Sequence, residues 1–209
     1  QFGVGGYRSA DTVFHLEARS ALADFVGMES AWLCGGFASA LAGVANRLMT
    51  PHDLVLFPQD SPELGRWVTG TLGASREFSP QDLSSLDTIL SESDDSYRQR
   101  WIVVESVSGM NGCPIDLPRL LALKREHRAR LLLDQSFSVG TMGPHGRGLS
   151  EHYDEDPREI DVLTGTTGFA LGTAGGYVAG STDMIRQLSG SDVFARDGMS
   201  VPHAAALAA

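Results

Sequence analysis

The chain has 209 residues and a formal net charge of −10 at pH 7, with 42% apolar and 20% charged residues. This composition is typical of one globular domain and excludes a disordered or collagen-like chain. No apolar run reaches the roughly 18 residues of a transmembrane helix, and the acidic balance argues against nucleic acid or an anionic membrane as the main partner. Two cysteines are too few for a disulfide framework and fit a reducing compartment.

Apolar periodicity predicts helices and strands that alternate along the chain. The continuous apolar runs of the strands are typical of a mainly parallel sheet covered by helices on both faces, so we expect an α/β fold. In chain order we expect a helix over 14–25 with Asp11 as its cap and Gly27 as its stop, a helix over 36–49, a strand over 53–57, helices over 64–72 and 80–90, a strand over 101–105, a helix over 117–127, and strands over 130–134, 160–163 and 176–180.

The two ends of the sequence resemble those of a fragment. The chain starts at Gln1 without a signal-peptide pattern, and residues 203–209 resemble the beginning of a helix. We therefore expect one large domain over 1–209 that is truncated at both ends, with any targeting or membrane segment outside this sequence.

The carboxyl ends of the predicted strands carry the candidate chemistry, because ligands of parallel α/β sheets bind beyond those ends. Asp134 follows three leucines, and a carboxylate there is either an acceptor for a protonated heterocyclic nitrogen or a loop and helix-cap acceptor. The glycine-rich segments 140–148 and 164–176 follow strands. Hydroxyls and backbone N–H groups over 164–176 could approach a phosphate, and a plain glycine-rich turn is the alternative. No glycine-lysine-serine/threonine sequence follows either segment, so neither is a P-loop.

Taken in order, several short motifs resemble the α-oxoamine synthase family, which comprises pyridoxal-phosphate enzymes with the large domain of class I and II aminotransferases. The resemblance implies a fold-type I transferase that joins an amino acid to an acyl thioester. The matching segments are 3–8, 15–17, 36–38, 102–105 with 110–112, 133–134, 143–148, and 165–166 with 175–176.

The sequence departs from this family at the residues that carry its chemistry. Phe169 stands where the family has its Schiff-base lysine, and Phe137 stands where a strand motif of the family has a histidine. Glu63, within one position, stands where a histidine stacks on the pyridine ring. Phenylalanine has neither a nucleophile nor a proton to transfer. The only lysine of the chain, Lys124, is predicted on a polar helix face far along the chain from Asp134.

Other family positions are retained. The resemblance implies that Asp134 pairs with the pyridine nitrogen, that Thr166 contacts the cofactor phosphate, and that Gly36 and Phe37 belong to the same cofactor site. These four residues are either an eroded binding site or remnants that hold the fold. His15 matches a family histidine near the substrate, and a packed helix histidine is the alternative. Cys34 and Cys113 have no metal-like spacing, and we expect no metal site.

One branch of the family, serine palmitoyltransferase, combines a lysine-bearing chain with a related lysine-less chain. The segments 136–140 and 146–153 resemble the lysine-less chain. This resemblance implies a non-catalytic subunit that supports the condensation of serine with palmitoyl-coenzyme A. It also implies a homologous partner that supplies the lysine and both histidines, and a place at the cytosolic face of the endoplasmic reticulum membrane. Pyridoxal phosphate would be bound in the complex but not covalently by this chain. The alternatives are another synthase of this family that uses untethered cofactor, and a structural or regulatory pseudoenzyme that binds no cofactor.

Overall fold

A seven-stranded, mainly parallel sheet forms the centre of the computed structural model, which describes residues 11–69, 74–93, 96–190 and 197–209. The strand order is β1-β7-β6-β5-β4-β2-β3, and β7 is antiparallel to both of its neighbours while the other pairs are parallel. The strands are β1 (Ser30–Cys34), β2 (Leu54–Pro58), β3 (Ala74–Phe78), β4 (Arg100–Glu105), β5 (Arg130–Asp134), β6 (Val162–Thr166) and β7 (Gly176–Gly180). The predicted mainly parallel α/β fold is therefore confirmed.

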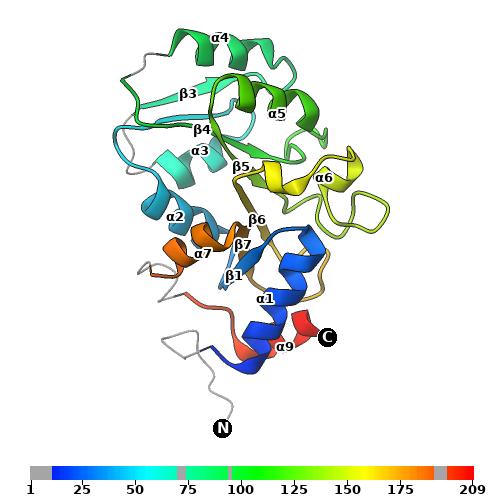
Figure 1. Ribbon diagram of the computed structural model, residues 1–209. Helices are drawn as coiled ribbons and strands as arrows, with labels where there is room; N and C mark the ends of the chain where they lie inside the picture. The colour runs from blue at the N-terminus through cyan, green and yellow to red at the C-terminus, as the bar shows by residue number, and fades with distance from the viewer. Residues whose placement is uncertain (1–10, 70–73, 94–95, 191–196) are drawn as a thin grey trace.

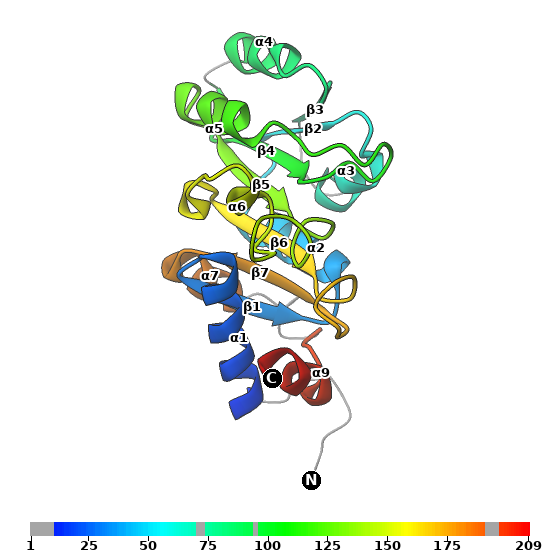
Figure 2. The same cartoon turned by 90° about the vertical axis from the view of Figure 1, so that its right-hand side faces the viewer.

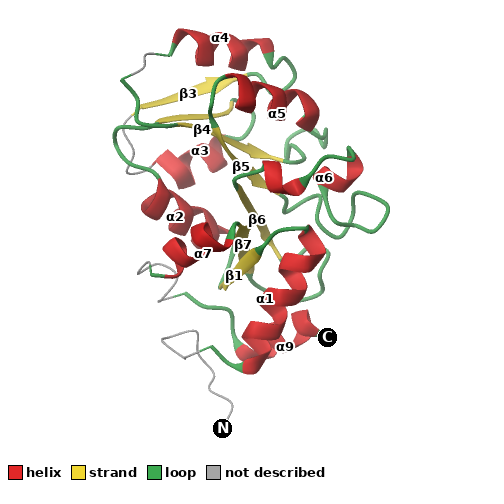
Figure 3. Cartoon of the chain, viewed as in Figure 1, coloured by secondary structure: helices red, strands yellow, loops and turns green. Residues whose placement is uncertain are grey.

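Helices cover both faces of this sheet, as Figures 1 and 3 show. The helices and one 3-10 turn are α1 (Val13–Val26), α2 (Phe37–Leu48), α3 (Pro62–Thr69), α4 (Ser84–Glu92), α5 (Leu117–Glu126), α6 (Leu149–His152), η1 (Pro157–Glu159), α7 (Thr182–Ser189) and α9 (Val201–Ala208). Helices α2, α3 and α7 pack on one face, and α1, α4, α5, α6 and α9 lie on the other (Figure 2). None of the helices in the described part of the chain has the length and apolar character needed to span a bilayer.

The continuous apolar strands explain why the sheet is covered on both sides, since alternate residues of one strand enter different cores. In β4, Ile102 and Val104 belong to the core under α1, α4 and α5, whereas Trp101 and Val103 belong to the core under α2, α3 and α7. Strand side chains point alternately to opposite faces, so a strand that is buried on both faces cannot alternate apolar and polar residues.

Several predicted boundaries differ from the structure for local reasons. The cap of α1 is Thr12, because the predicted cap Asp11 instead accepts two hydrogen bonds from the guanidinium of Arg19 at 2.7 and 2.8 Å. The predicted helix over 80–90 begins only at Ser84, after a turn in which Asp82 accepts from the Ser84 N–H at 3.0 Å. The predicted stop of α1 is confirmed, since Gly27 has φ 75 and closes the helix.

The topology brings the ends of distant segments to one edge of the sheet. β1, β4, β5 and β6 all run in the same direction, so their carboxyl ends lie at the same edge, together with the first residue of the antiparallel β7. Two residues, Gly35 and Gly36, separate the end of β1 from the start of α2. The candidate residues Gly36, Asp134 and Thr166 therefore lie along one edge, as the order of the predicted elements requires.

Candidate functional site

Asp134 is the buried carboxylate at the centre of this edge. It pairs in register with Glu105 of β4 and Thr164 of β6, and only 2% of its surface is exposed. The Ser136 N–H donates to Oδ1 at 3.0 Å, and the Thr164 hydroxyl donates to Oδ2 at 2.9 Å. Burial raises the pKa of Asp134 to about 7, the bonds from Ser136 and Thr164 oppose that rise, and the negative charge of Glu105 adds to it.

Thr166 is the last residue of β6, two positions after Thr164, and its hydroxyl is turned to its own loop. The Thr166 N–H donates to the hydroxyl oxygen of Ser136 at 3.1 Å, which links the ends of β5 and β6. The Thr166 hydroxyl donates to the carbonyl oxygen of Gly175 at 3.0 Å and accepts from the Gly168 N–H at 3.1 Å. These bonds stabilise the glycine-rich turn that the sequence allowed as an alternative to a phosphate contact.

Gly36 and Phe37 form the start of α2, directly beside β7. A methyl group on Gly176 would lie 2.9 Å from the backbone nitrogen of Phe37, so the two backbones meet closely. Asp197 also lies here: its carboxylate accepts a hydrogen bond from the Ser39 hydroxyl, and its backbone oxygen accepts from the Gly35 N–H at 2.9 Å. The start of α2 therefore already has an acidic side chain beside it.

The two aromatic replacements contact each other. The rings of Phe137 and Phe169 are stacked, with their centroids 5.2 Å apart and their planes at 15°. Phe137 is 46% exposed and Phe169 is 66% exposed, although both are large and apolar. Phe137 also lies next to Gly109, whose neighbour Met110 is 77% exposed. The rim of the site is thus apolar, and neither ring offers a nucleophile or a proton.

Lys124 lies at the opposite edge of the sheet. Its ammonium group forms an ion pair with Asp161 at 2.9 Å and donates to the backbone oxygen of Glu159. Asp161 immediately precedes β6, at the amino ends of the parallel strands. Lys124 is the only lysine in the sequence, so this chain has no lysine amine near Asp134.

The other two predicted positions, His15 and Glu63, lie in the first half of the chain. His15 is buried in α1, where its Nε2 lies 2.8 Å from the backbone oxygen of Met199 and its Nδ1 lies 2.9 Å from the Thr12 hydroxyl. Both ring nitrogens thus have partners within the chain, and a substrate contact by His15 stays a prediction. Glu63 lies in the first turn of α3 with an exposed side chain.

We tested whether these residues fit pyridoxal phosphate. A covalently held cofactor needs a lysine, and an anionic phosphate needs free donors without a competing carboxylate. Phe169 lacks the amine, the Thr166 hydroxyl bonds to Gly175, and Asp197 brings a carboxylate to the start of α2. Both oxygens of Asp134 already accept from neutral donors. The described residues therefore do not fit this cofactor, although the frame that surrounds them is kept.

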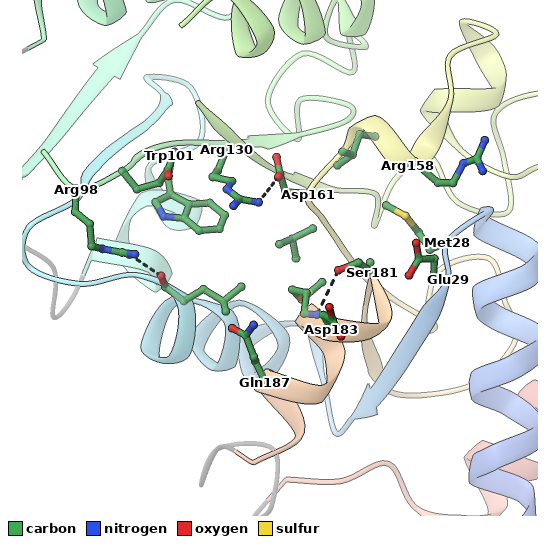
Figure 4. Close-up of a pocket in the computed structure, with 16 residues that line it drawn as sticks. Met28, Glu29, Arg98, Trp101, Arg130, Arg158, Asp161, Ser181, Asp183 and Gln187 are labelled. Atoms are coloured by element: carbon green, nitrogen blue, oxygen red, sulfur yellow. Dashed lines mark hydrogen bonds and ion pairs between the residues drawn. The ribbon is translucent and has the colours of Figure 1, made fainter. Parts of the chain in front are cut away.

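A cavity of about 460 Å³ lies at the other edge of the sheet (Figure 4). Trp101 and Arg130 line it with Arg98, which pairs with the buried Asp53. The cavity contains acidic and basic side chains alike and none of the predicted site residues. It is therefore separate from the strand-end site.

One group of potential metal ligands occurs elsewhere on the surface of the described part of the chain. Asp87, Glu126 and His127 bring their ligand atoms within 4.8 Å of one another. Asp87 already bonds to His127 at 2.8 Å and to Arg119 at 2.9 Å. This group lies between α4 and α5, away from Asp134.

Sequence reasoning missed four residues of the site: Ser39, Ser136, Thr164 and Asp197. Ser136 and Thr164 had a local signal, because hydroxyl residues near a strand-end carboxylate are natural donors to it. Asp197 had no such signal, since its partner Ser39 lies 158 residues away in the sequence.

The chain is similar to the aminotransferase class I and II family, whose model matches residues 6–209. It is 34% identical over 203 residues to Serine palmitoyltransferase 3 of Homo sapiens, covering 90% of this chain and 36% of that protein. It is 31% identical over 201 residues to Long chain base biosynthesis protein 1c of Oryza sativa subsp. japonica, covering 88% of this chain and 40% of that protein. It is 32% identical over 192 residues to 8-amino-7-oxononanoate synthase of Pseudomonas putida, covering 90% of this chain and 49% of that protein.

Solved structures share the fold. A serine palmitoyltransferase of Sphingomonas wittichii has a TM-score of 0.90 at 23% identity, with 99% of this chain and 53% of that chain covered. An 8-amino-7-oxononanoate synthase of Francisella tularensis has a TM-score of 0.84 at 18% identity, with 99% and 58% covered. The predicted resemblance and fold type are confirmed, and the chain spans only about a third to three fifths of the length of these relatives.

Proposed function

Because the chain belongs to the aminotransferase class I and II family, we propose that it is a lysine-less, non-catalytic subunit of a serine palmitoyltransferase. In this proposal a homologous lysine-bearing chain holds pyridoxal phosphate and condenses serine with palmitoyl-coenzyme A. This chain contributes a folded partner and part of the wall of the shared site. The complex would lie at the cytosolic face of the endoplasmic reticulum, attached through segments outside this sequence.

The observation that carries the proposal is the phenylalanine at position 169. It follows Thr166 by three positions in a segment whose glycines and strands are otherwise of the family type. The amine that this position would need is absent from the whole edge of the sheet, because Lys124 bonds to Asp161 at the other edge. The chain retains the fold of the family but lacks the nucleophilic lysine. This combination fits a subunit that supports a reaction catalysed by another chain.

The relatives support the enzyme class. They include proteins named serine palmitoyltransferase and a protein named for long chain base biosynthesis, at 28–34% identity. The choice of the non-catalytic subunit rests on Phe169 and Phe137 and not on the degree of identity, since relatives with either name match to a similar extent.

Two alternatives make different predictions. A stand-alone synthase would bind cofactor without a covalent link, and the loss of a positioned base commonly lowers a rate by about 10²–10⁴-fold. A purely structural or regulatory pseudoenzyme would bind no cofactor, and Asp134→Ala would then leave assembly and the partner's activity unchanged.

Two measurements test the proposal. The intact protein is isolated from its source cells, and its partners are identified. We expect a related chain with an intact lysine in a one-to-one ratio. The purified single chain is then mixed with pyridoxal phosphate, treated with borohydride and analysed by mass spectrometry, and we expect no cofactor-modified lysine.

The contradicting outcomes differ between the alternatives. Turnover of serine and palmitoyl-coenzyme A by the isolated chain would favour the stand-alone enzyme. Recovery without any related chain would favour the structural or regulatory role. A cofactor adduct on Lys124 would overturn the assignment of a lysine-less site.

A further inference from the structure

The cavity at the amino ends of the parallel strands is formed by segments that are far apart in the sequence. The turn between α1 and β1, the end of α2, the starts of β4, β5 and β6, and the start of α7 all contribute to its wall. Figure 4 shows these side chains around one common space. Its volume of about 460 Å³ lies within the range of small-molecule sites, roughly 300–1,000 Å³, which combine an apolar surface with a few placed polar groups.

Part of the wall of this cavity is apolar. Trp101 and Met28, which are 5% and 7% exposed, line it together with Met184. Indole and thioether groups make favourable contacts with rings and alkyl groups, and the unbranched methionine side chain adapts to the shape of its neighbour. An apolar side chain of a ligand would therefore find complementary contacts here.

Arg130 supplies hydrogen-bond donors on one side of the cavity. It pairs in register with Trp101 of the neighbouring strand, so the guanidinium group and the indole ring lie on the same face of the sheet. Its Nη1 donates to Asp161 at 2.7 Å, and no described residue accepts a hydrogen bond from its Nε or Nη2. Asp161 also forms an ion pair with Lys124 at 2.9 Å. One carboxylate thus faces two cations, which leaves an excess of positive charge on this side.

Glu29 supplies an acceptor on the opposite side. Figure 4 shows its side chain across the cavity from Arg130. The Thr182 N–H donates to Oε2 of Glu29 at 2.9 Å, which fixes the carboxylate, and no described residue donates to Oε1. Within the described part of the chain Glu29 forms no ion pair, in contrast to Asp161. Glu29 is thus a fixed negative charge without a close counter-ion.

We propose that this cavity binds a zwitterionic ligand with an apolar side chain, an amino acid or a short peptide. The ligand carboxylate accepts from Arg130, the ammonium group donates to Glu29, and the side chain packs on Trp101 and the two methionines. A guanidinium group matches a carboxylate in geometry, and fixed charges of opposite sign select a ligand that carries both. The inference goes beyond the proposed function, because the cavity lies at the other edge of the sheet from Asp134 and requires no partner chain.

Isothermal titration calorimetry of the intact protein tests this charge pattern. The probes are L-phenylalanine and the dipeptide glycyl-L-phenylalanine, whose charged ends lie further apart. We expect at least one of them to bind with a dissociation constant below about 1 mM, which a ligand of this size reaches when its groups are matched. Phenethylamine lacks the carboxylate and phenylpropionate lacks the ammonium group, so each should bind about tenfold more weakly than the zwitterion, or worse.

Substitutions of the two charged residues assign their roles. Glu29→Gln keeps an acceptor for the Thr182 N–H but removes the charge, so it should abolish the preference for the zwitterion over phenylpropionate. Arg130→Gln should likewise abolish the preference over phenethylamine. Glu17→Gln on the exposed side of α1 and Arg125→Gln on α5 change the net charge equally outside the cavity, and both should leave the affinities unchanged.

The proposal is overturned if neither zwitterion binds, or if the two analogues with a single charge bind as tightly as the zwitterion. It is also overturned if the two glutamine variants, shown to be folded by circular dichroism, bind like the wild type, or if the two control variants lose as much affinity. If a glutamine variant is unfolded, Glu29→Asp or Arg130→Lys replaces it. Each of these keeps the charge but moves it, and should therefore weaken binding of the zwitterion.

Discussion

Phe137 and Phe169 occupy the two positions where the family has a histidine and a lysine, and they stack on each other across a centroid distance of 5.2 Å. Each ring remains about half exposed or more, so neither is held by burial in a core. A stacked aromatic pair contributes roughly 0.5–1.5 kcal/mol beyond its buried area. The two rings are therefore expected to stabilise each other.

A double-mutant cycle with Phe137→Ala and Phe169→Ala measures this interaction. We expect a coupling energy of about 1 kcal/mol in the free energy of unfolding from urea denaturation, since the two rings contact each other directly. The matched control pairs Phe137→Ala with Met110→Ala, an exposed apolar residue of the same rim that has no aromatic ring to stack. Additive effects of the two phenylalanines would show that the stack contributes nothing in solution.

Asp134 gives the stability of the chain a predictable pH dependence. Burial raises its pKa from 3.8 to about 7, so between these values the folded chain binds a proton that the unfolded chain has lost. The free energy of unfolding then falls as pH rises through this window, at a rate of up to about 1.4 kcal/mol per pH unit. In Asp134→Asn this contribution should be absent.

Urea denaturation of wild type and Asp134→Asn at a series of pH values between 4 and 8 checks this expectation, with Asp183→Asn on the surface as the control. The wild type and the control should both lose stability towards pH 7, and Asp134→Asn should lose clearly less. Parallel curves for all three proteins would mean that Asp134 is ionised throughout the window.

At the scale of elements, two glycines of the site differ in what surrounds them. Gly165 lies in β6 opposite Tyr177 of β7, and a methyl group there would lie 2.7 Å from the buried tyrosine ring. Gly36, which precedes α2, has φ −173, and a methyl group added to it would meet open space. Strand packing therefore requires a glycine at 165, whereas nothing in the described fold requires one at 36.

We expect Gly165→Ala to lower the free energy of unfolding by about 1–3 kcal/mol, because overpacking a core forces neighbouring groups to move. Gly36→Ala should leave stability within about 1 kcal/mol of the wild type or raise it, since alanine restricts the unfolded chain. Thermal denaturation of both variants at one pH makes the comparison. Equal losses at the two positions would contradict the assigned packing of β6 against β7.

The sequence predicted best those elements whose apolar pattern is continuous. The strands over 130–134 and 176–180 lie where they were expected, because every residue of the two strands except the exposed Arg130 is buried. β1 and β3 were missed. Residues 75–77 of β3 are polar and exposed at the edge of the sheet, and such a strand has no apolar run to recognise.

The sequence predicted the position of a site residue only where that residue stands at the end of a predicted strand. Asp134 and Thr166 end their strands, so the topology alone places them at one edge. The loss of the lysine was visible at Phe169, but the stacking of Phe137 on that ring joins two loops and has no local signal. The same holds for Asp197, whose contacts with Gly35 and Ser39 depend on the path of the chain after α7.

At the scale of the whole molecule, the two edges of the sheet differ in character. The strand-end edge exposes Phe137, Phe169 and Met110, whereas the other edge holds the charged cavity of Figure 4 with Arg98 and Arg130. Exposed apolar groups that gather on one side of a protein commonly mark an interaction surface. A homologous partner that shares the site would therefore cover the strand-end edge and leave the charged edge open.

Hydrogen exchange with and without the lysine-bearing partner tests this arrangement. We expect slower amide exchange on complex formation over 137–141 and 167–173, because the loops that carry the two phenylalanines become buried. The amides of 182–187 belong to the helix that contributes Asp183, Met184 and Gln187 to the charged cavity, and they should exchange at an unchanged rate and provide an internal control. Replacing both phenylalanines by alanine should weaken the complex, since large buried aromatic side chains dominate the energy of most interfaces. Protection confined to 182–187 would instead place the partner on the opposite edge and would separate the proposed shared site from the assembly.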